Sequence, residues 1–335
     1  MSGSSAEIEV AGRTLSISNP DRIYFPTGET KMDVIEYYLD IEEAILQQLQ
    51  DRPVLLQRFP RGVTESNFFQ KRIPDTAPDW LTTTTVSTVN GTESQSLVIA
   101  DLAHIVWAVS IGCIGFHVWP VKASNTDIAD QLRIDLDPSP GQDFSDIVAA
   151  SKLAKQYLDE IGLDAGIKSS GNSGVHIYIN LESKWTPTQV RAAAVTIARN
   201  LENRHGDVLT ARWWKEERDG KVFIDFNQNA PHKTVFGAWN VRPVPGVKVS
   251  APFTWEELDD VSPEDLTIHS VPDRLFTNGD PWGHLPKSSI HDLIAEFDSH
   301  IADGGFDEPW PPQYPKQPHE APRVQPSRKK KPQAD

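Results

Sequence analysis

The segment Arg133-Ile-Asp-Leu-Asp-Pro138 alternates apolar and acidic residues. The apolar side chains fall on one side of this period-2 pattern and the two acids, Asp135 and Asp137, on the other, which predicts a strand with one face in the core. Carboxylates two residues apart on a strand have Cα atoms about 7 Å apart. Like charges that close repel unless a cation lies between them, and oxygen ligands suit Mg²⁺ or Mn²⁺. From this segment alone, an exposed strand face with two solvated aspartates is the alternative interpretation.

Charge and cysteine content narrow the classes of protein. The 335 residues are enough for one large domain or two. The single Cys113 excludes an internal disulfide framework and fits a reducing compartment. We expect a cytoplasmic protein without membrane contact, because no long apolar run or signal-like N-terminus is present. A net charge of −15 disfavours a large sequence-blind nucleic-acid groove, so a polyanionic partner needs focused cations or bound metal ions.

A second informative stretch runs from Ile167 to Leu181. The small residues Ser169 to Gly174 predict a turn whose backbone N–H groups converge as an anion-binding nest. His176 follows the turn at once, on the outward side of an alternating strand. A plain hairpin turn is the alternative explanation of the small residues alone.

Further candidates lie on other predicted strands and in the loops beside them. Asp225 interrupts an otherwise apolar strand, where a carboxylate is costly to bury unless it is paired or binds a metal. His117 lies opposite the apolar residues of the strand 115–120, although a strand histidine is more often structural. With Lys233 and Arg242 downstream, these residues predict a site for metal-bound triphosphate chemistry.

The N-terminal part carries two weaker signals. Thr30 predicts a helix start with a capping box, running to about residue 50. Lys31 then lies in the first turn, where the helix dipole disfavours a cation and a bound anion would relieve the mismatch. The adjacent Phe68 and Phe69 point opposite ways, so we expect one in the core and one available for base stacking. A solvated lysine and two core phenylalanines are the alternative interpretations.

Three ordered motifs resemble those of the archaeo-eukaryotic primase superfamily. They are Asp135-x-Asp137, Ser170-Gly-x-x-Gly-x-His176, and Ile224-Asp225 followed by Gln228-Asn229. Within that superfamily the surrounding phrases are similar to the polymerase domain of the bacterial end-joining ligase LigD, from Asn19 to about Leu285. A ligase-type Lys-x-Asp-Gly motif is absent from the sequence, so the resemblance is to stand-alone relatives of that domain.

The resemblance implies residue roles that the spacing alone does not give. It implies that two divalent ions, Mn²⁺ or Mg²⁺, are held by Asp135, Asp137 and Asp225. Contacts to the triphosphate and sugar of an incoming nucleotide are implied for His117, Ser170, Gly171, His176, Gln228, Lys233 and Arg242. The resemblance implies that Arg22 and Lys31 bind the 5′-phosphate of DNA. It implies contacts to the template for Arg58, Phe68, Phe69 and Lys71. Gln228, Ser173 and Gln57 stand where family members carry a cation, which implies weaker affinity for nucleotide or DNA.

The resemblance also implies the fold and the reaction. The fold is α/β, with an RRM-like antiparallel catalytic sheet and a supporting N-terminal α/β module. The implied boundaries are about 1–110 for that module, 111–250 for the catalytic sheet and 251–305 for C-terminal helices. Independently of the resemblance, the Pro-rich composition of residues 306–335 predicts a flexible tail ending in the basic cluster 327–331. Loose attraction to DNA and a solvated tail without a role are the two interpretations of that cluster. The implied reaction is template-directed nucleotide addition from NTP or dNTP, with ribonucleotides preferred.

The implied partners are gapped or broken DNA with a 5′-phosphate, Ku and a separate DNA ligase, in a bacterial nucleoid. Two other classes fit part of the pattern. A non-catalytic module that binds DNA ends needs only the 5′-phosphate residues. A metal-dependent phosphoesterase also uses a trio of acids.

Overall fold

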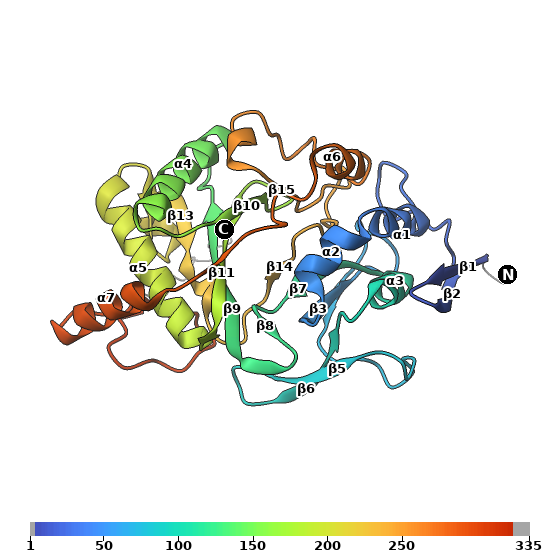
Figure 1. Ribbon diagram of the computed structural model, residues 1–335, viewed down its shortest axis with the longest axis horizontal. Helices are drawn as coiled ribbons and strands as arrows, with labels where there is room; N and C mark the ends of the chain where they lie inside the picture. The colour runs from blue at the N-terminus through green and yellow to red at the C-terminus, as the bar shows by residue number, and fades with distance from the viewer. Residues whose placement is uncertain (1–3, 324–335) are drawn as a thin grey trace, which may run out of the picture.

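The computed structural model describes residues 4–323, and the strands of this part of the chain form two large sheets and one hairpin. Figure 1 shows the two sheets side by side, with helices α4 (Phe144–Glu160), α5 (Pro187–His205) and α7 (His291–Ala302) around the first and α1 (Lys31–Asp40), α2 (Glu42–Leu49) and α3 (Leu102–Ser110) around the second. No helix between residues 4 and 323 is both long and apolar enough to span a membrane.

The first sheet carries the acidic motifs. Its central strand is β9 (Asn125–Asp137), which pairs antiparallel with β11 (Val175–Trp185) on one side and β13 (Val222–Asp225) on the other. The remaining strands extend or edge this core: β10 (Gly166–Ser169), β15 (Pro252–Phe253), β12 (Leu209–Thr210), β8 (Val121–Lys122) and β16 (Lys287–Ser288). The pairs β12–β13 and β11–β16 are parallel, so the sheet is mixed with an antiparallel centre.

The long helices begin where their sequence signals predict. Thr186 accepts a hydrogen bond from the Gln189 amide and Pro187 opens α5, as expected for an N-cap followed by proline. Asp143 caps α4 through the equivalent capping box. Helix α5 buries an alanine-rich face that includes Ala193 and Ala194, so it lies close against the first sheet.

The second sheet supports the first. Its strands run in the order β14 (Val235–Phe236), β7 (Cys113–Val118), β3 (Pro53–Arg58), β6 (Glu93–Val98) and β5 (Thr83–Ser87), with β4 (Phe68–Gln70) pairing the edge of β3. The hairpin β1 (Ser5–Val10) and β2 (Arg13–Ser18) lies beside it. Strand β7, which carries His117, and strand β14 both fall inside the range 111–250 that we predicted for the catalytic sheet, but they belong to the second sheet.

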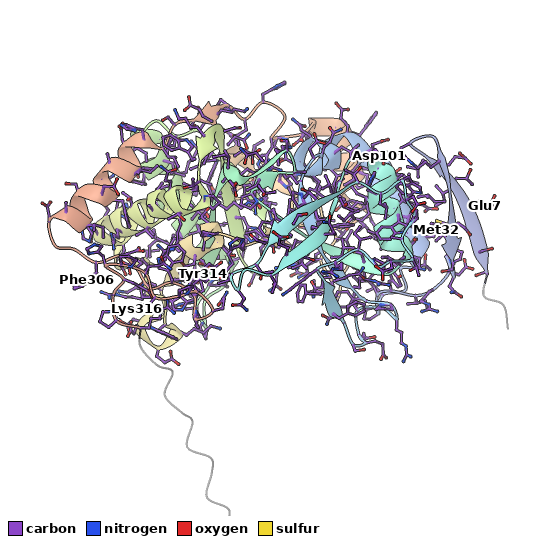
Figure 2. The ribbon with its side chains drawn as sticks, turned by 90° about the horizontal axis from the view of Figure 1, so that it is seen from below. Glu7, Met32, Asp101, Phe306, Tyr314 and Lys316 are labelled. Carbon is purple, nitrogen blue, oxygen red and sulfur yellow. The ribbon has the colours of Figure 1, made fainter. Side chains whose placement is uncertain are left out.

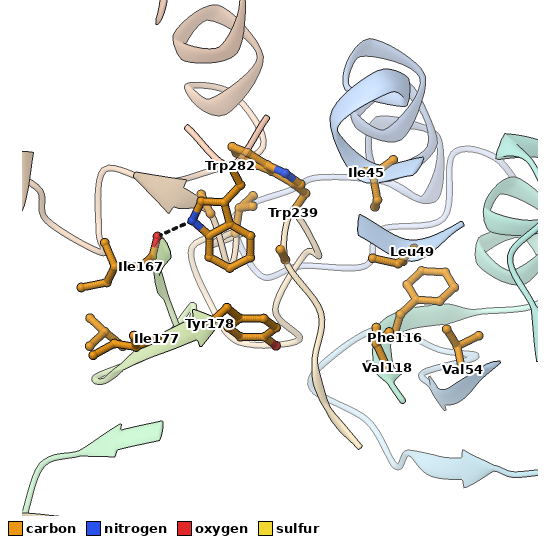
Figure 3. Packing of buried hydrophobic residues seen from close by; sticks show 14 of the residues in the cluster. Ile45, Leu49, Val54, Phe116, Val118, Ile167, Ile177, Tyr178, Trp239 and Trp282 are labelled. Atoms are coloured by element: carbon orange, nitrogen blue, oxygen red, sulfur yellow. Dashed lines mark hydrogen bonds between the residues drawn. The ribbon is translucent and has the colours of Figure 1, made fainter. Parts of the chain in front are cut away.

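One continuous core joins the two sheets. Trp239, 1% exposed, lies between them with Trp282, whose indole Nε1 donates to the Ile167 carbonyl (3.1 Å). Figure 3 shows this packing, with Tyr178 on the side of the first sheet and Leu49 on the side of α2. The two halves thus share buried surface and position the site as one unit.

The predicted helix 30–50 differs in one respect. Thr30 does form the capping box, with Asp33 as its partner, but the helix divides into α1 and α2 at Ile41. That residue leaves helical conformation (φ −112°, ψ 22°) and is buried. Two short helical elements lie between residues 250 and 280, within the range 251–305 that we predicted for C-terminal helices: a 3₁₀ turn at Trp255–Glu257 and helix α6 (Val271–Asn278).

The C-terminal part also departs from prediction. We expected a flexible tail from residue 306 on, but residues 306–323 pack against α5, with Trp310 and Tyr314 each 6% exposed. Figure 2 shows Phe306, Tyr314 and Lys316 at the end of the molecule opposite Glu7 and Met32. The two aromatic residues bury enough surface to hold the segment in place. The basic cluster 327–331 lies outside the described residues.

Candidate active site

Four polar side chains form a row across the first sheet. Asp225 of β13 pairs in register with Asp135 of β9, Asp135 pairs with His176 of β11, and His176 pairs with Lys168 of β10. Residues directly opposite one another in a sheet share a face. All four are buried, with exposed fractions between 0% and 9%. A row of two acids, a histidine and a lysine therefore crosses one face of four adjacent strands.

Asp137 completes the acidic group at the end of β9. It lies two residues beyond Asp135 and so on the same face, opposite Phe223 of β13. Pro138 follows directly, and the chain leaves the sheet. Asp135 and Asp137 on β9 and Asp225 on the neighbouring β13 therefore lie on one face of the sheet. That they bind metal ions stays a prediction.

Hydrogen bonds fix Asp225 but leave part of Asp135 free. The Asn227 backbone N–H donates to Asp225 Oδ1 (2.9 Å), and Gln228 Nε2 donates to Asp225 Oδ2 (2.9 Å) and Asp135 Oδ2 (3.3 Å). Asp135 Oδ1 is buried without a hydrogen-bond partner; the nearest histidine nitrogen, His176 Nε2, is 3.4 Å away. A buried carboxylate oxygen without a partner is costly, so this atom is a candidate for a bound ligand.

The acids disfavour one another's ionised form. Burial, then the charge of Asp137, raises the pKa of Asp225 to about 6. Burial and the neighbouring Asp137 and Asp225 raise the pKa of Asp135 well above its usual value. Burial, then the charges of Lys168 and Arg242, lowers the pKa of His176 well below its usual range. Perturbed pKa values of this kind cluster at functional sites.

These residues fit a divalent cation. Three carboxylates supply the hard oxygen donors that Mg²⁺ and Mn²⁺ prefer, and a cation would relieve their mutual repulsion. Asp135 Oδ1 is an unsatisfied oxygen ready to serve as a ligand. Across residues 4–323, no three His, Cys, Asp or Glu side chains lie in an arrangement that could hold a metal ion, so the three carboxylates would have to shift to bind one.

The small-residue turn differs from the predicted nest. The N–H groups of Asn172 and Gly174 donate to the Ser170 hydroxyl (3.2 Å each), and Gly171 N–H donates to Ser169 Oγ (2.9 Å). These amides are satisfied within the turn, so they do not form the open cradle that we predicted. The turn nonetheless borders the acids, since a Cβ on Gly174 would lie 2.5 Å from the Leu136 carbonyl oxygen and 3.6 Å from Asp137 Oδ1.

A cationic and aromatic cluster adjoins the row. Arg242 lies over the ring of Phe236 (4.2 Å from its guanidinium carbon to the centroid), and His117 contacts the same ring edge-on at 5.3 Å. His117 Nε2 also lies 3.2 Å from Gln57 Oε1. Burial, and then the charge of Arg242, lowers the pKa of His117 to about 4, so this imidazole is neutral near pH 7. The Phe236 ring of β14 thus contacts both Arg242 and His117 of the neighbouring strand β7.

Lys233 lies near Asp225. The charge of Asp225 favours its protonated form, although burial has the larger effect and lowers the pKa of its ammonium. Among the residues predicted for nucleotide contacts, those near the acids are His176, Gln228, Lys233 and Arg242.

The predicted 5′-phosphate residues occupy two different environments. Lys31 is 4% exposed, and its ammonium donates to the carbonyls of Ser18 (2.5 Å) and Ser110 (2.9 Å). Burial, then the charge of Arg22, lowers the pKa of Lys31 to about 8. Arg22 is exposed and donates to the Pro60 carbonyl (2.7 Å). The dipole mismatch predicted at Lys31 is therefore relieved by backbone carbonyls, and Arg22 is the accessible cation.

The predicted template residues form an exposed aromatic edge. Phe68 and Phe69 are 46% and 49% exposed, so our expectation that one enters the core is wrong. They lie on the three-residue edge strand β4, where Phe69 contacts His117 edge-on (5.3 Å between ring centroids) and both rings stay about half exposed. Arg58 lies over the Phe68 ring (5.2 Å) while donating to Gln70 and the Ile111 carbonyl, and Lys71 is exposed.

Sequence reasoning missed several residues of the site. Lys168 could have been predicted by pairing the strands before and after the turn 169–174, because that pairing places Lys168 opposite His176. A cavity of about 810 Å³ next to Asp137 and Asp225 is lined in part by Trp213, Trp214 and Arg218. These three lie between β12 and β13, in a stretch without a periodic pattern, so no sequence signal pointed to them.

Comparisons with known proteins identify relatives of this chain. The family model described as LigD, primase-polymerase domain, matches residues 30–282. The structure titled "Polymerase Domain from Mycobacterium tuberculosis Ligase D in complex with DNA" superposes with a TM-score of 0.77 at 29% identity, covering 81% of this chain and 97% of that one.

Curated relatives extend the comparison to longer proteins. The chain is 29% identical over 90% of its length to the multifunctional non-homologous end joining protein LigD of Mycolicibacterium smegmatis. It is 30% identical over 80% of its length to the bifunctional non-homologous end joining protein LigD of Bacillus subtilis. The chain spans 40% and 43% of these two relatives, so it corresponds to part of each.

These matches define a nucleotidyltransferase of the primase-polymerase class, which uses a divalent metal ion and a nucleoside triphosphate. Within that class, the chain belongs to the LigD primase-polymerase domain family.

Proposed function

We propose that this protein performs template-directed nucleotide addition at short gaps or breaks in DNA, with ribonucleotides preferred and non-homologous end joining as its setting. The observation that carries the proposal is the register of Asp225 with Asp135, which lies two residues before Asp137 at the end of β9. The names of the relatives support the setting, since they are end-joining proteins.

The residues of the site divide the work of the reaction. Asp135, Asp137 and Asp225 hold the divalent ions, with Mn²⁺ preferred over Mg²⁺. When bound, two such ions activate a 3′-hydroxyl and stabilise the charge of departing pyrophosphate. Arg242, near Asp135 and Asp137, and Lys233, near Asp225, supply positive charge for the triphosphate. Burial lowers the pKa of both His117 and His176, so these imidazoles are neutral. A neutral imidazole offers the nucleotide one hydrogen-bond donor and one acceptor.

Recognition of DNA uses the second sheet. The exposed Phe68 and Phe69 provide a stacking surface for template bases, with Arg58 and Lys71 beside them for phosphates. Arg22, supported by Lys31, binds the 5′-phosphate of the downstream strand. Filling a gap leaves a nick that a DNA ligase must join. We therefore propose that the protein acts with a separate DNA ligase and with Ku at broken DNA ends in a bacterial nucleoid.

Arg22 should determine discrimination between 5′-phosphate and 5′-hydroxyl ends. We expect Arg22→Gln to weaken binding of a 5′-phosphorylated gap by roughly 10- to 100-fold, since a hydrogen bond to a charged group contributes about 1.5–3 kcal/mol. Binding of the same gap with a 5′-hydroxyl should be little changed. Fluorescence anisotropy with both DNAs measures the difference. The control is Arg204→Gln, which removes the same charge at an exposed arginine paired with Glu160. If both variants lose the same affinity for the 5′-phosphorylated gap, the assignment of Arg22 is wrong.

Phe69 should contribute to template binding without a large effect on stability. Because the ring is 49% exposed, Phe69→Ala removes little buried surface, whereas loss of one base stack costs about 1–3 kcal/mol of binding. We expect weaker binding of DNA with a single-stranded template and an unchanged melting temperature. A variant that melts much earlier but binds DNA normally would assign Phe69 to folding.

Primer extension tests the proposed function as a whole. A gapped duplex with a labelled primer is incubated with the full chain, NTP or dNTP, and Mn²⁺ or Mg²⁺. We expect addition directed by the template base, strongest with Mn²⁺, ribonucleotides and a downstream 5′-phosphate. Binding without extension under all conditions would favour the end-binding module, and shortening of the DNA without added nucleotide would favour the phosphoesterase.

A further inference from the structure

A C-terminal strap, defined as residues 306–323, lies outside the part of the chain that the family model matches. It follows α7 and turns back along α5, closed by a backbone pairing between Asp307 and Glu320. Tyr314 donates its hydroxyl to the Pro231 carbonyl, just beyond the turn that follows Asp225. The strap therefore connects the C-terminal end of the described chain to the back of the active site.

A buried arginine joins the strap to α5. Arg191, 1% exposed, donates from Nη1 to both carboxylate oxygens of Asp307 (2.9 and 3.0 Å). Its Nη2 donates to the Glu308 carbonyl (2.9 Å). Trp310 covers the guanidinium (4.2 Å to the ring centroid) and donates its indole N–H to Asp307 Oδ2 (2.7 Å). Both charged groups are thus paired and excluded from water.

The same arginine reaches the turn that carries the third acid. Arg191 Nε donates to Asn227 Oδ1 (2.8 Å), and Asn227 Nδ2 donates to the Pro309 carbonyl of the strap (3.0 Å). The backbone N–H of Asn227 donates to Asp225 Oδ1 (2.9 Å). A continuous series of hydrogen bonds therefore runs from Asp307 through Arg191 and Asn227 to Asp225.

Stability alone is a weak explanation for this arrangement. A buried ion pair contributes little net stability compared with apolar side chains of the same volume, because desolvation offsets the attraction. Its geometry, in contrast, is directional: the fork of the guanidinium orients Asn227 relative to the strap. Residues that orient metal ligands through hydrogen bonds typically change affinity or activity when replaced.

We propose that Arg191 and Asp307 are positioning residues that hold the 3₁₀ turn Phe226–Asn229, and through it the Asp225 carboxylate, in its place beside Asp135. This role rests on the proposed function. The turn is thus held by the strap as well as by its own hydrogen bond from the Asn227 N–H to Asp225. In this role Arg191 and Asp307 act on Asp225 without contacting nucleotide or DNA.

The test compares two neighbouring strap residues in the full chain. Asp307→Asn preserves shape but removes the charge that orients Arg191. Glu308→Gln breaks the neighbouring ion pair with Arg199 (3.0 Å), which does not extend to the turn. We expect Asp307→Asn to lower kcat for nucleotide addition by roughly 10- to 100-fold with unchanged KM for nucleotide, and Glu308→Gln to leave both constants unchanged.

Amide hydrogen exchange gives a second readout that needs no catalysis. In Asp307→Asn the amides of residues 226–229 should exchange faster than in wild type, and in Glu308→Gln they should not. If wild type adds no nucleotide, the proposed function fails while hydrogen exchange still decides the role of the strap. Equal exchange at the turn in both variants, or equal kcat, would overturn the proposal. If Asp307→Asn does not fold, Arg191→Lys, which keeps the charge but loses the fork, serves in its place.

Discussion

Replacing Asp137 with alanine should abolish nucleotide addition while leaving DNA binding intact. Asp137 ends β9 and borders the cavity of about 810 Å³ that also reaches Asp225. Metal ions supply several kcal/mol of transition-state stabilisation, so loss of a ligand is expected to reduce the rate by about 10³-fold or more. Single-turnover primer extension with Mn²⁺ measures this loss.

The matched measurement is binding of 5′-phosphorylated gapped DNA by the same variant. Arg22 and the exposed phenylalanines belong to other elements, so affinity should equal that of wild type. Asp159→Ala removes an exposed carboxylate paired with Lys155 on α4 and should retain full activity. Extension by Asp137→Ala at more than a tenth of the wild-type rate would assign the carboxylate a supporting role only.

Replacing Asp225 with asparagine should remove activity and stabilise the protein without metal. The folded state raises the pKa of this carboxyl from 3.8 to about 6. Above pH 6 the folded state holds a charge that burial and Asp137 disfavour, and each pKa unit corresponds to about 1.4 kcal/mol. Asparagine removes that charge. We therefore expect the free energy of unfolding at pH 7.5 to rise by roughly 1–3 kcal/mol, while extension is lost.

The sign of this effect fixes its pH dependence. A carboxyl with a raised pKa in the folded state binds protons more tightly there than in the unfolded state, so the wild type gains stability as the pH falls through 6, and the gain is complete below 3.8. The advantage of Asp225→Asn should then shrink over the same range. Urea unfolding in the presence of a chelator at several pH values measures it. An asparagine variant less stable than wild type at pH 7.5 would show that burial and the charge of Asp137 do not destabilise the ionised carboxylate.

Part of the site could be predicted from the sequence because sheet geometry is periodic. The alternation in 133–138 placed Asp135 and Asp137 on one face, and a single apolar strand placed Asp225 on a neighbour. Once β11, β9 and β13 pair in the observed register, the acids lie on one face. Turn chemistry was predicted less well, since whether an amide points outward or donates to a nearby serine depends on local hydroxyl positions, as at Ser170.

The remaining features depend on contacts between distant segments. The burial of Lys31 follows from two carbonyls 13 and 79 residues away, and no local pattern encodes such pairs. The strap was missed because its proline-rich composition resembles that of disordered segments. Its order depends on Arg191, 116 residues from Asp307. Only its two aromatic residues, Trp310 and Tyr314, hinted that it could be buried.

The central claim is that Asp135 on β9 and Asp225 on β13 bind the same divalent ions. Electron paramagnetic resonance of bound Mn²⁺ tests this claim most directly. The full chain, with a non-hydrolysable nucleotide, is titrated with Mn²⁺ and compared with Asp135→Asn and Asp225→Asn. If the two carboxylates share one metal site, each substitution should weaken Mn²⁺ binding, although the two residues lie on different strands. Manganese affinity equal to wild type in both variants would show that these carboxylates do not form the metal site.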